Sequence, residues 1–488
     1  MGSGAPENDS RPPFATFHQE ISGPVVIIFE ACIVTGGPDA LQTGYEVLEL
    51  GACRYYPVSQ DVFCMRDELR RGSLPVVFLT VFIDLMGFGI VLPLLPIYAD
   101  VFTVDPSGWR LGLLMASFSI MQLLFAPFWG RLSDRIGRRP VLIIGLVGSV
   151  LFYLLFGIAT VMRSIELLFV SRIGAGMAGA TIPTAQAYIA DSTSLKKRPQ
   201  GMALIGMAFG MGFTLGPLAG SLAVPGGRGE PGPWPGYAAA GLSAIALILA
   251  IWKLPESLRP DSRSAAPAGM RWREFQQALS VASVGLLLTA IFVCIFSFAN
   301  FETTLSMLIK GSAETQASPF RFTWGQVCLT YAYIGFTMTL VQGMLVRRLA
   351  GRISEGKLAG WGAVSQVAGF AVALAAIQQS SAPLLMVALG VITGGAGLMQ
   401  PSLNSLLSRR SDPDKQGAIM GVGQSVNALA RILGSGLGIP MLRGALMLPY
   451  LTSMVLMSAA LVLIILAARS GKDYSSDRSE LRSETLAS

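Results

Sequence analysis

Twelve apolar stretches follow one another between residues 74 and 468, and each is long enough to cross a bilayer. About 20 apolar residues in a helix span a hydrocarbon core about 30 Å thick. Because a backbone inside lipid must satisfy its own hydrogen bonds, we expect these segments to be helices. The spans are expected at 74–98, 109–129, 141–161, 165–190, 201–223, 236–254, 280–308, 324–346, 358–378, 382–407, 417–440 and 445–468.

The composition is that of a polytopic all-α membrane protein. Hydrophobic residues make up 52% of the chain and charged residues 13%, whereas about a quarter of a soluble domain is charged. The net charge of +7 comes from Lys and Arg in short loops between apolar segments, which argues against nucleic acid as a partner. The sequence has no HExxH, no CxxC, no paired-Asp motif and no Ser–His set in the membrane portion. We therefore expect no enzyme activity, metal or cofactor.

The basic residues predict how the chain is oriented. In the loops between the expected spans, nineteen Lys and Arg residues fall on one side and six on the other. By the positive-inside rule, the richer side is cytoplasmic, so both termini are expected in the cytoplasm. We expect a multi-pass, monomeric protein of the cell membrane, or of an organellar membrane in a eukaryote.

Residues 1–73 differ from the rest because they hold acidic residues, three of the five cysteines and the single histidine, His18. We expect a poorly ordered cytoplasmic extension there, with a small accessory domain as the alternative. Residues 255–279 are rich in Pro, Arg and Ser and predict a cytoplasmic linker. The expected organisation is thus a six-helix half at 74–254, the linker, a second half at 280–468 and a cytoplasmic tail at 469–488.

The two expected halves resemble each other in sequence. Gln200-Gly201 matches Gln416-Gly417, and Gly179-Ala180 matches Gly395-Ala396 at the same offset. A parallel six-plus-six repeat places a binding cavity at the interface between the halves, near the bilayer midplane.

Asp84 is a lone carboxylate near the middle of the first span. A charge at that depth costs about 2.5–3.5 kcal/mol on insertion scales, so it indicates a functional site by default. We interpret Asp84 as a site for a proton or a cationic substrate. A carboxylate that snorkels or is paired for structural reasons is the alternative.

The loop between the second and third spans carries Gly130, Asp134, Gly137 and a run of basic residues that includes Arg131, Arg135, Arg138 and Arg139. This loop closely resembles the cytoplasmic signature of the major facilitator superfamily. The acid at 134 can face the N-terminus of a neighbouring helix, and Arg138 can pair with Asp191. The resemblance implies a gate that closes the cytoplasmic side in one conformation. The matching second-half segment, 343–348, lacks the acid. A basic loop that serves only topology is the alternative.

Arg172 lies inside the fourth span beside Gly174, Gly176 and Gly179. These glycines satisfy GxGxxG, but an intramembrane helix offers no βαβ unit, so we interpret them as packing residues. The guanidinium must find a carboxylate or water. We expect Asp84 as its partner, which resembles the arginine motif of proton-coupled antiporters in the superfamily. A purely structural pair is the alternative.

The fifth span contains Gly206, Gly210, Gly212, Gly216 and Pro217. It resembles the motif of drug/proton antiporters, in which small residues face a neighbouring helix and a proline marks an expected kink. With the stretch around Asp84, the chain is most similar to the tetracycline/proton antiporter group over residues 74–468. The ninth span contains no acid, a departure from the second-half acid that this resemblance implies.

Two more charges are expected inside the membrane, Glu302 in the seventh span and Arg431 in the eleventh. Either contacts substrate, or both form a structural pair at the interface between the halves. The side chains expected to line the cavity are amides: Gln122, Gln186, Gln342, Asn404, Gln424 and Asn427.

The sequence thus predicts the twelve-helix fold of the major facilitator superfamily and proton-coupled export of small amphipathic organic compounds by alternating access. The expected partners are a small-molecule substrate, protons and lipid. The alternative is a facilitator or symporter for organic anions or metabolites.

Overall fold

The computed structural model describes residues 16–17, 29–30, 60–103, 105–193, 198–224, 230, 232–258, 282–310, 318–349, 352–411 and 416–470. The chain divides into two compact units, Met1–Gly72 and Ser73–Ser488. In the first unit, strands β1 (Thr16–Phe17) and β2 (Phe29–Glu30) pair antiparallel. Most of the extension expected to be poorly ordered, most of the 255–279 linker and residues 471–488 lie outside the described residues.

The second unit is built of helices that follow the apolar stretches, and the first of them, α1, begins at Gln60 within the first unit. The first half contains α1 (Gln60–Val91), α2 (Leu95–Phe102), α3 (Trp109–Ile136), α4 (Arg138–Met162), α5 (Ile165–Gly179), α6 (Ile182–Ser192), α7 (Arg198–Leu222) and α8 (Trp234–Lys253). The second half contains α10 (Ala282–Lys310), α11 (Trp324–Leu340), the π-helix η4 (Val341–Val346), α12 (Arg347–Leu349), α13 (Glu355–Gln379), α14 (Ala382–Arg409), α15 (Gln416–Gly444) and α16 (Leu448–Ser470).

Eleven helical segments in the described chain are long and apolar enough to cross a membrane. They coincide with eleven of the expected spans. The remaining expected span, 417–440, is helix α15, which carries Arg431 and is not among the eleven. The twelve-helix fold predicted from the sequence is confirmed.

Three spans are interrupted, which the apolar pattern alone did not predict. The first breaks between α1 and α2 around Pro93, and the fourth breaks between α5 and α6 just before Pro183. Proline lacks an amide hydrogen and clashes with the preceding turn, so it ends a helix or begins a new one. The eighth span widens into the π-helix η4, a form that is frequent at functional sites.

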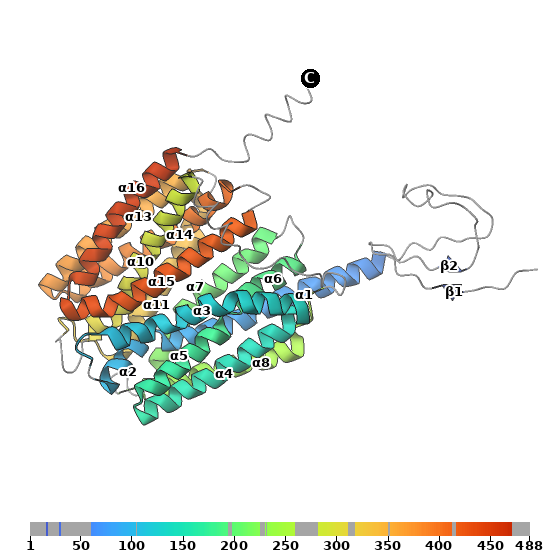
Figure 1. The fold of residues 1–488 in the computed structure, drawn as a ribbon, viewed down its shortest axis with the longest axis horizontal. Helices are drawn as coiled ribbons and strands as arrows, with labels where there is room; N and C mark the ends of the chain where they lie inside the picture. Colours follow the sequence, from blue (N-terminus) through green and yellow to red (C-terminus); the bar gives the residue numbers. More distant parts are fainter. Residues whose placement is uncertain are drawn as a thin grey trace, which may run out of the picture. The chain divides into compact units, whose positions relative to one another are not determined.

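Each half packs mainly within itself, and a few helices join the two. The helices from α1 to α8 lie together, with those from α10 to α16 beside them (Figure 1). The halves meet where α3 contacts α15 and where α7 contacts α11. Small residues allow the first contact to be close: a Cβ on Gly112 would lie 3.2 Å from the Pro440 ring.

Helices α1 and α7 approach each other backbone to backbone. A Cβ on Gly216 would lie 2.7 Å from the Met86 carbonyl oxygen and 2.8 Å from the Gly89 Cα. No side chain fits there without moving a helix. This contact fixes the part of α1 that directly follows Asp84.

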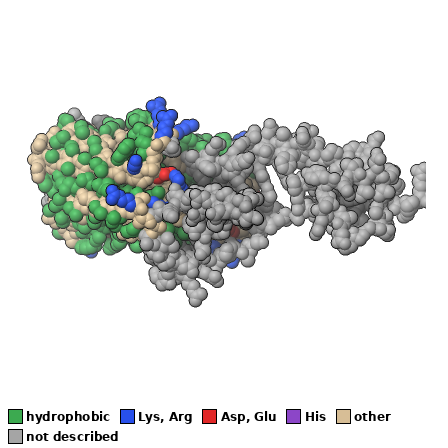
Figure 2. Space-filling model, turned by 90° about the horizontal axis from the view of Figure 1, so that it is seen from above, with side chains coloured by type: hydrophobic (Ala, Val, Ile, Leu, Met, Phe, Trp, Pro, Cys, Tyr) green, Lys and Arg blue, Asp and Glu red, His purple; other side chains and the backbone are tan. Residues whose placement is uncertain are grey.

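The halves are joined at one end of the bundle. The Tyr98 and Trp324 rings have centroids 5.5 Å apart, and Arg443 forms an ion pair with Asp100. Toward the other end, the hydroxyls of Thr214 and Thr339 lie 3.5 Å apart across the two halves. We call that other end, which carries the loop around Arg138, the basic end. Figure 2 shows Lys and Arg side chains clustered at one end of the largely apolar surface.

Candidate functional site

Asp84 lies on α1 and faces α4 and α8 of its own half. The Ser243 hydroxyl on α8 donates a hydrogen bond to the Asp84 carboxylate at 3.1 Å. Ser149 on α4 is a second hydroxyl partner, and the Tyr153 phenol lies close enough to interact with the carboxylate. The carboxylate is therefore held by neutral hydroxyls inside the first bundle.

Arg172 lies on α5 and is only 3% exposed. Its guanidinium carbon lies 4.7 Å from the centre of the Phe118 ring and 5.8 Å from the centre of the Phe88 ring. Its Nε has no hydrogen-bond partner. Cation–π contacts contribute about 0.5–2 kcal/mol, less than the several kcal/mol that a desolvated ion costs. Arg172 is therefore a buried cation whose need for an anion is unmet among the described residues.

The direct ion pair expected between Asp84 and Arg172 is not formed in this conformation. Neither residue has a salt-bridge partner within 4.0 Å in the described chain. The Tyr153 phenol lies within electrostatic range of both charges. The reason is helix rotation, because α1 turns Asp84 toward Ser243 while α3 presents Phe118 to the guanidinium.

Arg138 is the centre of a polar cluster at the basic end. Its guanidinium pairs with Asp191 at 3.2 Å, as predicted, with Asp134 at 2.5 Å, and with the Ser133 hydroxyl at 2.6 Å. The side chain is only 11% exposed. We call Arg138, Asp134, Asp191 and Ser133 the Arg138 cluster. It ties α3, α4 and α6 together within the first half.

The acid that caps the N-terminus of α4 is Glu256, not Asp134. Asp134 was expected to face a helix N-terminus, but it pairs with Arg138 instead. The Glu256 carboxylate accepts the backbone N–H groups of Arg138 and Arg139 at 2.9 and 3.1 Å. Glu256 follows α8 directly, so this cap joins the end of α8 to the start of α4, where the helix dipole favours a negative charge.

The two glycines of the loop have different surroundings. Gly137 ends α3 with φ +110°, and a Cβ there would meet the Glu256 carboxylate, so only glycine fits. Gly130 lies inside α3 with no atom within 4 Å of its Cβ position. Arg135 lies in the last turn of α3, and Arg139 donates to the Ile251 carbonyl at 2.6 Å.

The second half holds a pair in the equivalent place with the charges exchanged. Arg138 begins α4 and Asp191 lies near the end of α6, whereas Glu355 begins α13 and Arg409 ends α14. Arg409 contacts Glu355 at 2.7 Å. The 343–348 segment lacks an acid, but Glu355 supplies one from the following helix.

Glu302 on α10 and Arg431 on α15 form an ion pair at 3.1 Å. Both helices belong to the second half, so the pair does not join one half to the other. The Arg431 side chain stays 39% exposed and the Glu302 side chain 15%. The backbone carbonyl of Glu302 also accepts the Tyr331 hydroxyl at 2.6 Å.

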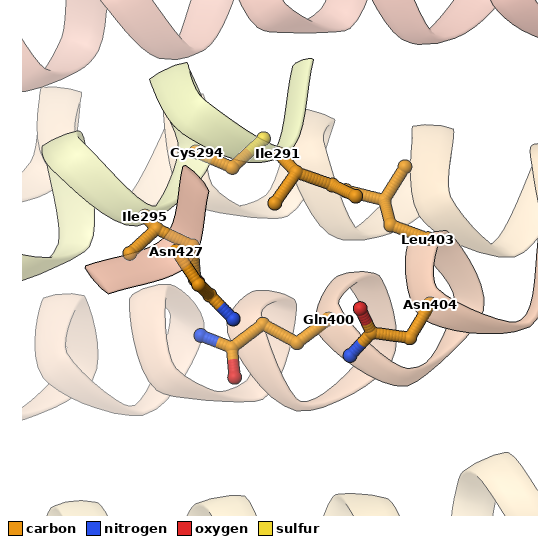
Figure 3. Close-up of a pocket in the computed structure, with 7 residues that line it drawn as sticks. All are labelled: Ile291, Cys294, Ile295, Gln400, Leu403, Asn404 and Asn427. Atoms are coloured by element: carbon orange, nitrogen blue, oxygen red, sulfur yellow. The ribbon is translucent and has the colours of Figure 1, made fainter. Parts of the chain in front are cut away.

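The expected amides separate into two groups. In the first half, Gln122 on α3 donates to the Gly179 carbonyl at 3.4 Å, and Gln186 lies partly exposed on α6. In the second half, Asn427 on α15 and Asn404 on α14 line one small pocket of about 30 Å³. Gln400, which the sequence reasoning missed, completes its polar wall (Figure 3). Its place one turn before Asn404 was the available signal. Gly216 and Pro217 lie on α7 against α1.

Residues 77–435 match the family model described as Major Facilitator Superfamily. The chain belongs to the major facilitator superfamily. Its helical membrane architecture is that of a transporter rather than an enzyme.

Within this superfamily, the chain is similar in sequence to two curated relatives. The chain is 31% identical over 368 residues to the class C tetracycline resistance protein of Escherichia coli, covering 74% of this chain and 88% of that protein. It is 29% identical over 426 residues to the major facilitator superfamily domain-containing protein 10 of Homo sapiens, covering 75% of this chain and 86% of that protein.

Solved structures show the same superfamily fold. The crystal structure of the human organic anion transporter MFSD10 (TETRAN) superposes with a TM-score of 0.61 at 27% identity, covering 81% of this chain and 99% of that one. The nucleoside transporter NupG superposes with the same TM-score at 15% identity, covering 81% of this chain and 98% of that one. The second likeness concerns the fold alone.

Proposed function

We propose that this superfamily member exports small amphipathic organic compounds in exchange for protons. The observation that carries the proposal is the arrangement of Asp84 and Arg172. The carboxylate is held only by neutral hydroxyls, while the cation lies on two aromatic rings without a carboxylate. Among neutral hydroxyls, Asp84 is more stable with its proton bound. When Asp84 loses the proton, it becomes the anion that Arg172 lacks.

The conformation fits one state of such a cycle. The Tyr98–Trp324 ring contact and the Asp100–Arg443 ion pair join the halves at one end, which supports a state that is closed at that end. With the basic end in the cytoplasm, this state faces inward and is ready to take substrate from the cell. The Arg138 cluster acts as the gate at that end, and Gly216 and Pro217 hold α7 against α1 while the halves rock.

Asp84→Asn tests the coupling. In inverted vesicles, we expect the wild-type protein to accumulate tetracycline when a proton gradient is imposed. In the variant, this uptake should fall at least about tenfold, because the amide cannot exchange a proton. Exchange of tetracycline without a gradient should survive. Glu166→Gln, which changes an exposed acid on α5, is the matched control. Gradient-driven uptake at the full rate in Asp84→Asn would remove the proposal.

An organic-anion carrier is the second candidate. The buried, unpaired Arg172 favours it, as does the likeness to a protein named an organic anion transporter. In that case benzoate uptake would proceed without a proton gradient, survive Asp84→Asn and disappear in Arg172→Gln. The two candidates therefore differ in the Asp84→Asn variant, which loses gradient-driven uptake under the first and keeps its uptake under the second.

A further inference from the structure

The Glu302–Arg431 pair is a charged site inside the membrane that the Asp84–Arg172 arrangement does not use. Arg431 lies near the middle of α15, and Glu302 lies on α10. The Arg431 side chain is nevertheless 39% exposed. Charged side chains at membrane depth nearly always face the interior of the bundle or a water-filled cavity, where they mark the path of a substrate or an ion. We therefore interpret the exposed surface of Arg431 as part of the substrate path.

The helix faces that carry the pair also line a pocket. Asn427 and Ile295 border the small pocket between α10, α14 and α15 (Figure 3). Asn427 precedes Arg431 by four residues, and Ile295 precedes Glu302 by seven. Residues at these spacings lie on one face of a helix. Gln424, seven residues before Arg431, is exposed on the same face of α15, so that face is polar over two turns.

Most of the hydrogen-bonding capacity of Arg431 is unused. Its Nη2 donates to the Glu302 carboxylate at 3.1 Å, and its side chain has no other hydrogen bond in the described chain. A guanidinium has five N–H donors and no acceptor, so it offers donors whichever way it turns. Arg431 is also the more accessible partner, because Glu302 is only 15% exposed. A ligand that reaches this pair therefore meets a positive charge with open donors.

An anionic oxygen fits these donors best. A carboxylate binds a guanidinium through two parallel hydrogen bonds, each about twice as strong as a bond between neutral groups. A neutral carbonyl gains only a weaker bond, and a cationic ligand is repelled by the partner that it meets first. The geometry therefore favours a negatively charged group over a neutral or a positive one.

Glu302 is placed to neutralise the guanidinium while the site is empty. Partly exposed ion pairs contribute little to stability because water screens them, so a second carboxylate can compete for Arg431. The backbone carbonyl of Glu302 accepts the Tyr331 hydroxyl at 2.6 Å, which ties Glu302 to α11. The guanidinium of Arg431 is held only by Glu302 among the described residues, so it is the partner that can turn toward a ligand.

We propose that Arg431 binds an anionic oxygen of the transported compound, a carboxylate or a deprotonated enol, and that Glu302 is its counter-ion when the site is empty. Ile295, two turns away on the same face of α10, is placed to contact the apolar body of the compound. The inference rests on the proposed function only in taking the protein to transport a small amphipathic compound. It deepens that function by naming the charge and the chemical class that the second half recognises.

Benzoate and benzamide test the site because they differ in charge but hardly in shape. Calorimetry measures the Kd of each for the purified full-length protein, and the wild type should bind benzoate at least about tenfold more tightly. Arg431→Gln should raise the benzoate Kd at least about tenfold, because it removes charge-assisted hydrogen bonds. Glu302→Gln should lower the benzoate Kd about threefold or more, because it removes the competing carboxylate.

Two further variants control for charge and for folding. Arg431→Lys keeps the positive charge and should retain a preference for benzoate over benzamide, whereas Arg431→Gln should lose that preference. Arg163→Gln breaks another exposed Arg–Glu pair, the one with Glu230, and should leave the benzoate Kd unchanged. The Tm of each variant shows whether it is folded.

The outcomes separate this inference from the proposed function. Wild-type protein without a preference for benzoate over benzamide overturns the site, and that measurement needs no variant. Unchanged benzoate binding in Arg431→Gln, as expected if Arg172 alone receives the anion, also overturns it. Weaker benzoate binding in Glu302→Gln would show that the pair is structural and would overturn the counter-ion role. If benzoate binding follows the expected order while Asp84→Asn keeps its full gradient-driven uptake, the site stands and the proton-coupled mechanism falls.

Discussion

Asp100 and Arg443 form an ion pair that joins the two halves, and their side chains are only 7% and 6% exposed. Asp100 lies on α2 and Arg443 lies in the last turn of α15. Gly108, with φ +73°, allows Ile439 and Arg443 to pack against the start of α3. Any motion that opens this end must break the pair, so its strength sets how often the end opens.

Asp100→Asn should therefore favour the open arrangement at this end. Removing one partner of a buried pair costs about 3–5 kcal/mol, and that cost falls on the contact between the halves. The measurement is maleimide labelling of a cysteine placed at Ile439 in a background without native cysteines. We expect labelling to rise at least about tenfold. Glu230→Gln, which breaks an exposed pair with Arg163 inside one half, should leave it unchanged. Equal labelling in Asp100→Asn and wild type would contradict this prediction.

The Arg138–Asp191 pair and the Arg409–Glu355 pair should contribute unequally to the transport rate. Arg138→Glu places a new acid beside Asp134, Asp191 and Glu256 in a little-exposed cluster. Arg409→Glu faces Glu355, and Arg409 is 47% exposed, so water screens the change. We expect the initial transport rate to fall at least about tenfold in the first variant and about twofold in the second.

Exchange of Glu355 and Arg409 provides the control for those rates. Glu355→Arg with Arg409→Glu recreates an attractive pair, so the double variant should recover the rate that the Arg409→Glu variant loses. Folded yield by size-exclusion chromatography distinguishes a gating defect from misfolding. A double variant as slow as the single one would show that the pairing itself is irrelevant.

Gly216→Ala should separate α1 from α7. The added methyl would lie 2.7 Å from the Met86 carbonyl oxygen, and overpacking of this kind costs about 1–3 kcal/mol. We expect the Tm of the purified protein to fall by several degrees. Gly206→Ala on the same helix meets no atom within 4 Å and should leave the Tm unchanged or slightly raised. Equal Tm values for both variants would refute the close contact.

Arg172→Met should stabilise the fold while abolishing transport. Arg172 is buried without a carboxylate partner among the described residues, so an apolar side chain of similar length removes a desolvated charge. Replacing buried ions with apolar residues often gains roughly 1–4 kcal/mol. Arg138→Met removes a cation paired with two carboxylates and should instead lower the Tm. A lower Tm in Arg172→Met would mean that the cation is paired in the dominant state.

The local features of the fold were predictable from the sequence. The apolar stretches gave the positions of the helices because lipid forces the backbone to bond within itself. Arg138 and Asp191 could be paired in advance because both lie at helix ends of the same half, close to a short connection. Pro93 and Pro183 also carried the signal for the interrupted spans.

Side-chain partners inside the bundle were decided by the tertiary structure. The sequence placed Asp84 and Arg172 on neighbouring helices, but helix rotation turned one toward Ser243 and the other onto Phe118. Glu302 met Arg431 within one half, and Asp100 met Arg443 across 343 positions of sequence. A long apolar stretch determines that a segment crosses the membrane. Which of its faces meets a neighbour depends on how small residues such as Gly216 let the helices approach, and that is a property of the packed bundle.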